Sequence, residues 1–123
     1  MNWMSAGALF ALVGVALGAF GAHSLRTRVT PRDLEIFEVA VRYQLYHALA
    51  IIVTGLILWW RGLDVSRLLT LTPWLFTAGI VLFSGSLYLL VITGKRWLGA
   101  VTPIGGVLFL AGWLLLALAL WQK

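Results

Sequence analysis

The residues that could do chemistry lie mostly between Phe37 and His47, where a charged stretch runs into an apolar one. Tyr43 and His47 are four residues apart, so a helix places them on one face. Histidine gains and loses a proton near neutral pH, so His47 could take part in proton transfer. The alternative is a neutral imidazole that bonds to a tyrosine or serine of a neighbouring helix and serves packing alone.

Glu38 and Arg42 offer a second kind of chemistry in the same stretch. They are also four residues apart, with the acid first, which is the favourable order for a helical ion pair. Such a pair could bind a substrate or relay charge. It could equally neutralise two charges at a membrane surface, where Arg42 also reaches lipid phosphates.

The elements that position these residues are predicted to be membrane helices. The chain has 123 residues, of which 62% are hydrophobic and 11% charged, whereas a soluble domain is roughly 45–50% apolar and about 25% charged. One soluble core of this size cannot hide the excess, so the outside must be apolar as well. The absence of cysteine excludes disulfides and thiolate sites. The net charge of +5 indicates topology and contact with lipids, including anionic ones, and no nucleic-acid partner.

The apolar runs predict an all-α, integral membrane four-helix bundle in a single domain, with antiparallel neighbours and short loops. We expect spans over about 3–22, 41–60, 73–92 and 102–120, with an interfacial helical lead-in over 31–40. A threonine precedes each proline, at Thr30, Thr72 and Thr102, which predicts three helix starts and no proline inside a span. A cleaved signal peptide is rejected because basic residues follow the first apolar run instead of preceding it.

Basic residues indicate how the bundle lies in its membrane. The side with the first and third connections holds six, namely Arg26, Arg28, Arg32, Arg42, Lys95 and Arg96. The other side holds three, namely Arg61, Arg67 and Lys123. Since cytoplasmic loops carry the excess of Lys and Arg, both termini are predicted to lie outside.

Polar side chains from all four spans are predicted to meet at the same end of the bundle. Ionisable and polar groups are costly in lipid, so their meeting point is the default place to look for function. This candidate polar cluster comprises His23, Glu38, Arg42, Tyr43, Gln44, Tyr46, His47, Ser84, Ser86, Tyr88 and Thr102. The two histidines lack a third nitrogen or sulfur ligand, so we predict no metal and no cofactor. No nucleophile with its base and orienting group is visible, so no catalytic residue is predicted.

Glycines are predicted to let helices approach closely. The residues expected to do so are Gly7, Gly14, Gly18, Gly21, Gly85, Gly105 and Gly106. The first four recur at three-, four- and seven-residue steps on one face of the first helix. We therefore expect the first helix to pack centrally, and its glycine face could also serve a homo-oligomer.

Four blocks of sequence resemble a known family in the same order. They are Leu17 to His23, Phe37 to Ala50, Leu82 to Tyr88 and Thr102 to Gly106. Together they are similar to the small bacterial membrane family called domain of unknown function 423, of the YgdD and YwdK type, and to the animal small transmembrane protein 256. That family often has threonine where this chain has Val39. The resemblance implies a four-helix plasma-membrane protein and supplies no activity.

Three functions are compatible with these features. The first is a structural or accessory membrane module that associates with itself or with a partner. The second is a subunit of a transporter or channel for protons, small solutes or lipids, which would need an oligomer because four spans are few. The third, ranked last, is a membrane enzyme with His47 as base and Arg42 on an anionic group.

Overall fold

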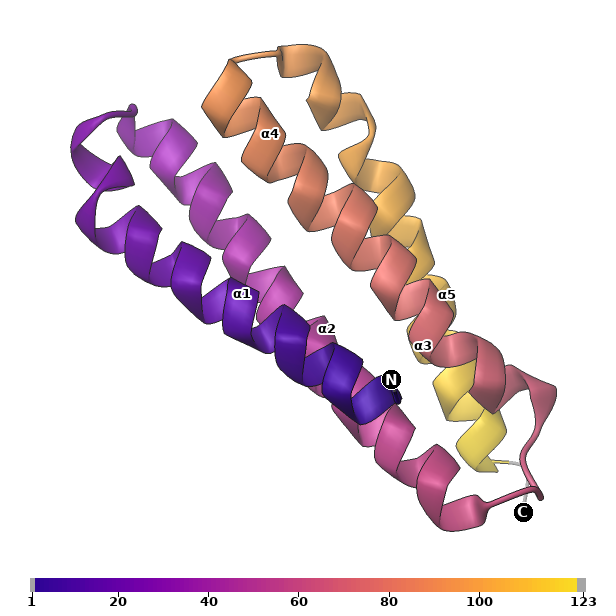
Figure 1. Cartoon of the computed structure of the whole chain (residues 1–123). Helices are drawn as coiled ribbons and strands as arrows, with labels where there is room; N and C mark the ends of the chain where they lie inside the picture. Colours follow the sequence, from indigo (N-terminus) through magenta and orange to yellow (C-terminus); the bar gives the residue numbers. More distant parts are fainter. Residues whose placement is uncertain (1, 122–123) are drawn as a thin grey trace.

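The computed structural model describes residues 2–121, so Lys123, counted above with the outer basic residues, lies outside the described part. Two helical hairpins lie side by side (Figure 1). The first pairs α1 (Trp3–His23) with α2 (Pro31–Arg61), and the 3-10 turn η1 (Leu25–Thr27) lies between them. The second pairs a run made of α3 (Arg67–Gly79), the π-helical η2 (Ile80–Ser84) and α4 (Gly85–Thr93) with α5 (Thr102–Trp121), joined through the 3-10 turn η3 (Arg96–Ala100).

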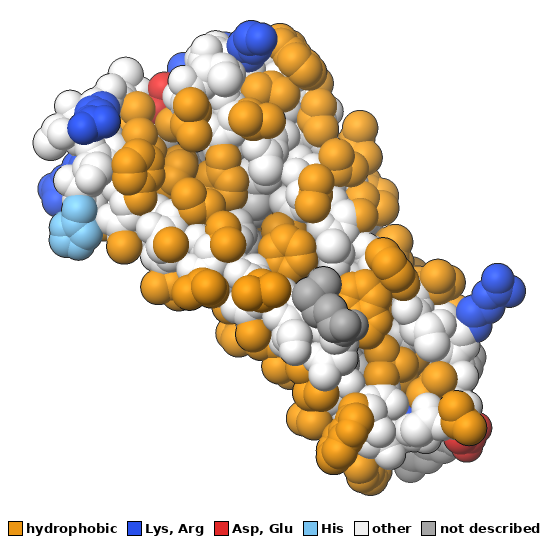
Figure 2. All heavy atoms as spheres, in the orientation of Figure 1, with side chains coloured by type: hydrophobic (Ala, Val, Ile, Leu, Met, Phe, Trp, Pro, Cys, Tyr) orange, Lys and Arg blue, Asp and Glu red, His pale blue; other side chains and the backbone are white. Residues whose placement is uncertain are grey.

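Within residues 2–121, four helical runs are long and apolar enough to cross a membrane. The all-α four-helix membrane bundle predicted from the sequence is therefore confirmed. The outer surface fits this assignment: hydrophobic side chains cover the middle of the bundle, and Lys and Arg gather toward its ends (Figure 2). Both ends of the described chain lie toward the α2–α3 connection (Figure 1).

Two helix starts show where local rules hold and where they fail. Thr30 caps α2 as expected, since its hydroxyl accepts from the Asp33 N–H at 3.2 Å and Pro31 follows it. The expected start at Thr72 is wrong, because α3 begins at Arg67 and Pro73 lies inside it. Ser66 supplies the cap by accepting from the Leu69 N–H at 3.3 Å. Pro73 is the seventh residue of α3, so it removes the hydrogen bond to the Leu69 carbonyl and its ring crowds that carbonyl.

The first helix is peripheral, and the expectation that it packs centrally is wrong. Only 17% of the residues in its most apolar stretch are buried, against 44% for the corresponding stretch of α2. Its buried residues are Gly7, Gly14 and Gly21, which form one narrow face against α2. Its large exposed side chains are apolar and face outward, as membrane lipid requires; they are Leu9, Leu12, Val13, Val15 and Phe20. The central helix is α2, which contacts α1, α3, η2 and α4.

The core has two parts along the bundle. One forms around Ile51, Leu69, Phe76 and Phe109, and the other around Phe37 and its neighbours toward the α1–α2 connection. Between them runs η2, where the Gly85 N–H bonds to the Ile80 carbonyl five residues back. Such π turns shift the register of the following helix and often occur at functional sites. Here residues of η2 contact both α2 and α5.

Candidate functional site

The predicted polar cluster does not meet as one site. Its members that lie exposed are His23, Glu38, Arg42, Tyr43 and Tyr46. Buried or partly buried are Gln44, His47, Ser84, Ser86, Tyr88 and Thr102. The expected pair between Glu38 and Arg42 is not formed, since the ion pair found within residues 2–121 joins Arg96 to Asp33.

Gln44 joins three helices. It is 3% exposed, and its amide Nε2 donates to the Phe10 carbonyl of α1 at 2.8 Å. Its Oε1 accepts from the Tyr88 hydroxyl of α4 at 2.7 Å. An amide with a donor side and an acceptor side thus matches one acceptor on α1 and one donor on α4. Gln44 therefore fixes how these two helices lie against α2.

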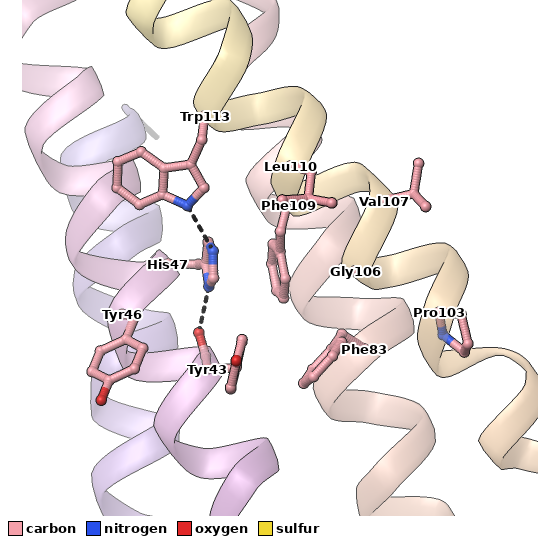
Figure 3. A pocket seen from close by; sticks show the side chains of 10 residues that line it. All are labelled: Tyr43, Tyr46, His47, Phe83, Pro103, Gly106, Val107, Phe109, Leu110 and Trp113. Atoms are coloured by element: carbon pink, nitrogen blue, oxygen red, sulfur yellow. Dashed lines mark hydrogen bonds between the residues drawn. The ribbon is translucent and has the colours of Figure 1, made fainter.

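His47 is bonded on both ring nitrogens (Figure 3). Its Nδ1 lies 2.7 Å from the Tyr43 carbonyl, which can only accept, so Nδ1 carries the proton. Its Nε2 accepts from the indole N–H of Trp113 on α5 at 3.1 Å. The ring also stacks on Phe109 with centroids 3.5 Å apart and planes 7° apart. These contacts select one neutral tautomer, because a proton on Nε2 would face the Trp113 donor.

The serines of the η2–α4 segment tie their run to both neighbours. The Ser84 hydroxyl donates to the Ala40 carbonyl of α2 at 2.7 Å. Ser86 shares a 2.7 Å hydrogen bond with Thr102 at the start of α5 and bonds to the Phe83 carbonyl at 2.9 Å. These hydroxyls hold the η2–α4 segment against α2 and α5.

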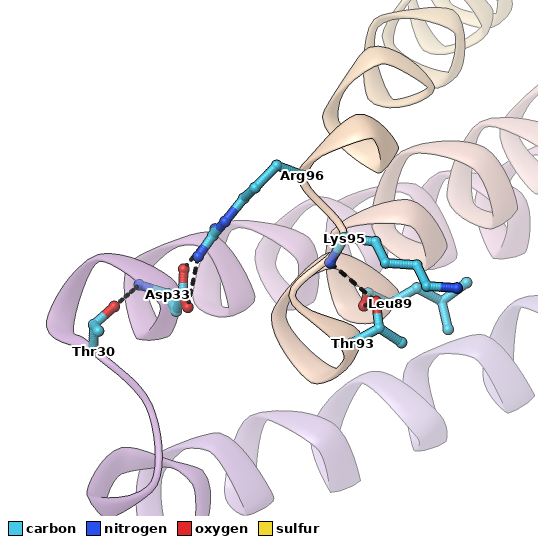
Figure 4. Close-up of polar contacts among 6 residues, drawn as sticks. All are labelled: Thr30, Asp33, Leu89, Thr93, Lys95 and Arg96. Carbon is cyan, nitrogen blue, oxygen red and sulfur yellow. Dashed lines mark hydrogen bonds and ion pairs between the residues drawn. The ribbon is translucent and has the colours of Figure 1, made fainter.

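An ion pair that the sequence did not indicate joins the first turn of α2 to η3 in the α4–α5 connection (Figure 4). The Arg96 guanidinium donates to both carboxylate oxygens of Asp33, at 2.9 and 3.1 Å. Asp33 lies in the first turn of α2 and Arg96 begins η3, so the pair links the two hairpins. Two parallel bonds give this contact a defined geometry.

Trp113 is the residue that sequence reasoning missed. The other tryptophans lie near span ends, but Trp113 lies in the middle of the fourth predicted span. Tryptophan prefers the membrane interface and needs an acceptor for its N–H when it is away from water. A mid-span tryptophan was therefore a signal that a buried acceptor faces it, and His47 is that acceptor.

The glycines differ in what they contact. A Cβ on Gly7 would lie 2.6 Å from Ile52 Cγ1, and one on Gly14 2.9 Å from Leu45 Cδ2. Gly18 and Gly21 likewise face Val41 and Phe37 of α2. Gly105 lies against the Phe83 backbone, whereas Gly85 has open space and Gly106 meets only ordinary contacts. The glycine face of α1 is thus covered by α2 within this chain. Three further glycines pack closely without having been singled out: Gly55, Gly79 and Gly112.

An aromatic groove lies between α2 and α5, and we call it the α2–α5 groove (Figure 3). Its volume is about 630 Å³. Tyr43, Tyr46 and His47 line it from α2, and Phe83, Pro103, Gly106, Val107, Phe109, Leu110 and Trp113 line it from the second hairpin. The Tyr43 and Phe83 rings stack at 4.7 Å and form one wall. The groove is apolar and open at the side, where a membrane supplies lipid.

In the described part of the chain, no three His, Asp or Glu side chains gather in a group that could hold a metal ion. The buried polar groups bond to one another and to backbone carbonyls across helix contacts. The fold and these contacts define a small four-helix integral membrane protein.

Comparison with known proteins places this membrane protein in a family. The family model described as protein of unknown function (DUF423) matches residues 17–106, and the chain belongs to that family. It is 43% identical over 113 residues to the UPF0382 membrane protein YwdK of Bacillus subtilis, covering 92% of this chain and 90% of the relative.

Two staphylococcal relatives extend the likeness. A UPF0382 membrane protein of Staphylococcus epidermidis is 49% identical and one of Staphylococcus aureus 46% identical, each over 113 residues, covering 92% of this chain and 89% of the relative. No solved structure matches. The family description and these names assign a membrane protein and no specific activity.

Proposed function

We propose that this chain is a structural or accessory module of the bacterial inner membrane, in which the buried members of the polar cluster fix the register of the four helices. The observation that carries the proposal is the state of His47, whose two ring nitrogens are both bonded inside the bundle. Gln44, Ser84 and Ser86 are likewise bonded across helix contacts. In lipid such bonds hold helices together where the hydrophobic effect cannot.

The transport alternative is the weaker reading because its main candidate is occupied. Proton transfer needs a nitrogen that can exchange its proton with water or substrate. His47 would have to break its bond with Trp113 and leave its stack on Phe109 before it could do so. Arg42 and Glu38 lie exposed, and the ion pair found within residues 2–121 includes neither of them.

The proposal includes a placement in the membrane and a set of contacts. Both termini lie outside, and the end that carries Arg42 faces the cytoplasm and anionic lipids, as the distribution of basic residues favours. Self-association is also proposed, but through a surface other than the glycine face of α1, because α2 covers that face.

A flux measurement tests the proposed role. The full chain is reconstituted in vesicles with a pH gradient and an internal pH-sensitive dye, and a proton ionophore is added at the end as a positive control. We expect the same leak as in protein-free vesicles. In the same preparation, Trp113→Phe is expected to weaken folding by about 1 kcal/mol through loss of one interhelical bond. A proton flux that His47→Ala abolishes would contradict the proposal.

The chain has no cysteine, so single cysteines can test the placement. Leu63→Cys lies in the α2–α3 connection and Thr27→Cys in the α1–α2 connection, both at exposed positions. A membrane-impermeant maleimide should label the first in intact cells and the second only after lysis. The reverse pattern would contradict the proposed orientation without affecting the fold.

A further inference from the structure

We propose that the α2–α5 groove is a lipid site that takes one hydrocarbon chain of an anionic glycerophospholipid, with the headgroup phosphate at Arg42. This inference deepens the lipid contact proposed above and rests on the proposed placement of the Arg42 end at the headgroups. Three observations carry it: the dimensions of the groove, two tyrosine side chains that line it, and an exposed guanidinium next to them on α2.

The dimensions fit one chain in one leaflet. The groove extends along α5 from Pro103 to Trp113 (Figure 3), which is about 15 Å at about 1.5 Å per residue. That is about half of the roughly 30 Å hydrocarbon core. Its volume of about 630 Å³ lies within the range of small-molecule sites. Trp113 closes the inner end, because its indole spans from α5 to His47 on α2.

Tyr43 and Tyr46 precede His47 on α2, so they line the groove on the Arg42 side of the Trp113–His47 bond. Both side chains line the groove, and within residues 2–121 neither hydroxyl has a hydrogen-bond partner. A hydroxyl without a partner is costly in an apolar setting, and tyrosine is favoured where its ring is in lipid and its hydroxyl meets polar groups. The ester carbonyls of a glycerophospholipid lie at this boundary and accept such bonds.

The charge near the mouth selects an anionic lipid. Arg42 is one helical turn before Tyr46, lies exposed, and takes no part in the ion pair that the described residues form. Guanidinium binds phosphate oxygens through two parallel bonds. The same end carries six basic residues against three acidic ones, which are Asp33, Glu35 and Glu38. A net positive field at this end favours phosphatidylglycerol over a zwitterionic lipid.

Native mass spectrometry of the full chain tests the site. The protein is delipidated in mild detergent, and phosphatidylglycerol or phosphatidylcholine is added at equal concentration. We expect one phosphatidylglycerol per chain, retained roughly tenfold better than phosphatidylcholine, as for one charge-assisted contact. Arg42→Gln should remove this preference. Arg61→Gln, at the opposite end of the same helix, is the matched control and should keep it.

Filling the groove tests where the chain lies. Gly106 lines the groove and a Cβ there would touch Phe83 at no less than 3.9 Å, so Gly106→Leu fits and blocks the space. Gly85→Leu is the matched control, since Gly85 also has open space but does not line the groove. We expect Gly106→Leu to lower lipid retention roughly tenfold and Gly85→Leu to leave it unchanged. Helicity by circular dichroism checks folding, and Val107→Trp fills the same groove should Gly106→Leu not fold.

Three results would overturn the inference. They are equal retention of both lipids by the wild type, unchanged retention after the groove is filled, and a neutral lipid or quinone that displaces phosphatidylglycerol. None of them touches the helix-register role proposed for the buried polar groups, because Arg42 and Gly106 make no side-chain hydrogen bond between helices within residues 2–121. Failure of the lipid site and failure of the structural role are therefore distinguishable.

Discussion

Gln44 offers the sharpest test of the helix-register role, because one side chain bonds to two other helices. Gln44→Leu keeps a similar shape and removes the 2.8 Å bond to the Phe10 carbonyl and the 2.7 Å bond from the Tyr88 hydroxyl. Interhelical hydrogen bonds in membranes average about 0.6 kcal/mol and reach about 1.7. Two lost bonds and one stranded hydroxyl therefore predict a loss of about 2 kcal/mol in the free energy of unfolding.

A double-mutant cycle separates the bond from the stranded hydroxyl. Tyr88→Phe removes the hydroxyl that Gln44 accepts from, so the double variant should recover about 1 kcal/mol relative to Gln44→Leu. Unfolding is followed by circular dichroism in mixed micelles as the fraction of denaturing detergent rises. Tyr46→Phe makes the same chemical change where no bond to the bundle exists, and should shift stability by less than about 0.5 kcal/mol. A coupling energy near zero between Gln44 and Tyr88 would refute the reasoning.

Three further predictions use the same unfolding assay. The Thr77 hydroxyl is buried without a partner, so Thr77→Val should be neutral or stabilise by about 1 kcal/mol, and a clear loss would show a hidden partner. Gly7→Leu should destabilise by more than about 1 kcal/mol because its Cβ meets Ala48 O at 2.7 Å and Ile52 Cγ1 at 2.6 Å; stability equal to wild type would mean that α1 is displaced at little cost. Asp33→Arg should destabilise by breaking the pair with Arg96, and adding Arg96→Asp should restore part of the loss; no restoration would mean that the pair does not link the hairpins.

The sequence was sufficient for the membrane helices and for the starts of α2 at Pro31 and α5 at Thr102. Composition requires lipid, and Thr30 with Pro31 specifies the start of α2 through purely local chemistry. The same pair of residues at Thr72 and Pro73 does not start a helix, because Ser66 caps α3 earlier and α3 continues through the proline. Local patterns name possible starts, and the competing cap decides between them.

The contacts of the candidate site could not be read from the sequence for a different reason. Gln44 bonds to a backbone carbonyl of α1, and every residue has such a carbonyl, so no pattern marks Phe10 as the partner. The glycine face of α1 indicates close packing, but the pattern does not distinguish α2 from a second copy of the chain as the partner. Trp113 was a readable signal, since a mid-span indole needs an acceptor.

The tautomer of His47 tests the central claim, that the buried polar groups are closed on one another, most directly. Selective ¹⁵N-histidine labelling of the full chain in lipid nanodiscs gives signals from two histidines, and His23→Gln identifies those of His47. The account predicts a single neutral form at neutral pH, with Nδ1 protonated and Nε2 accepting from Trp113. Trp113→Phe should shift the Nε2 signal. A charged imidazolium, or two tautomers in exchange, would contradict the account and return His47 to proton chemistry.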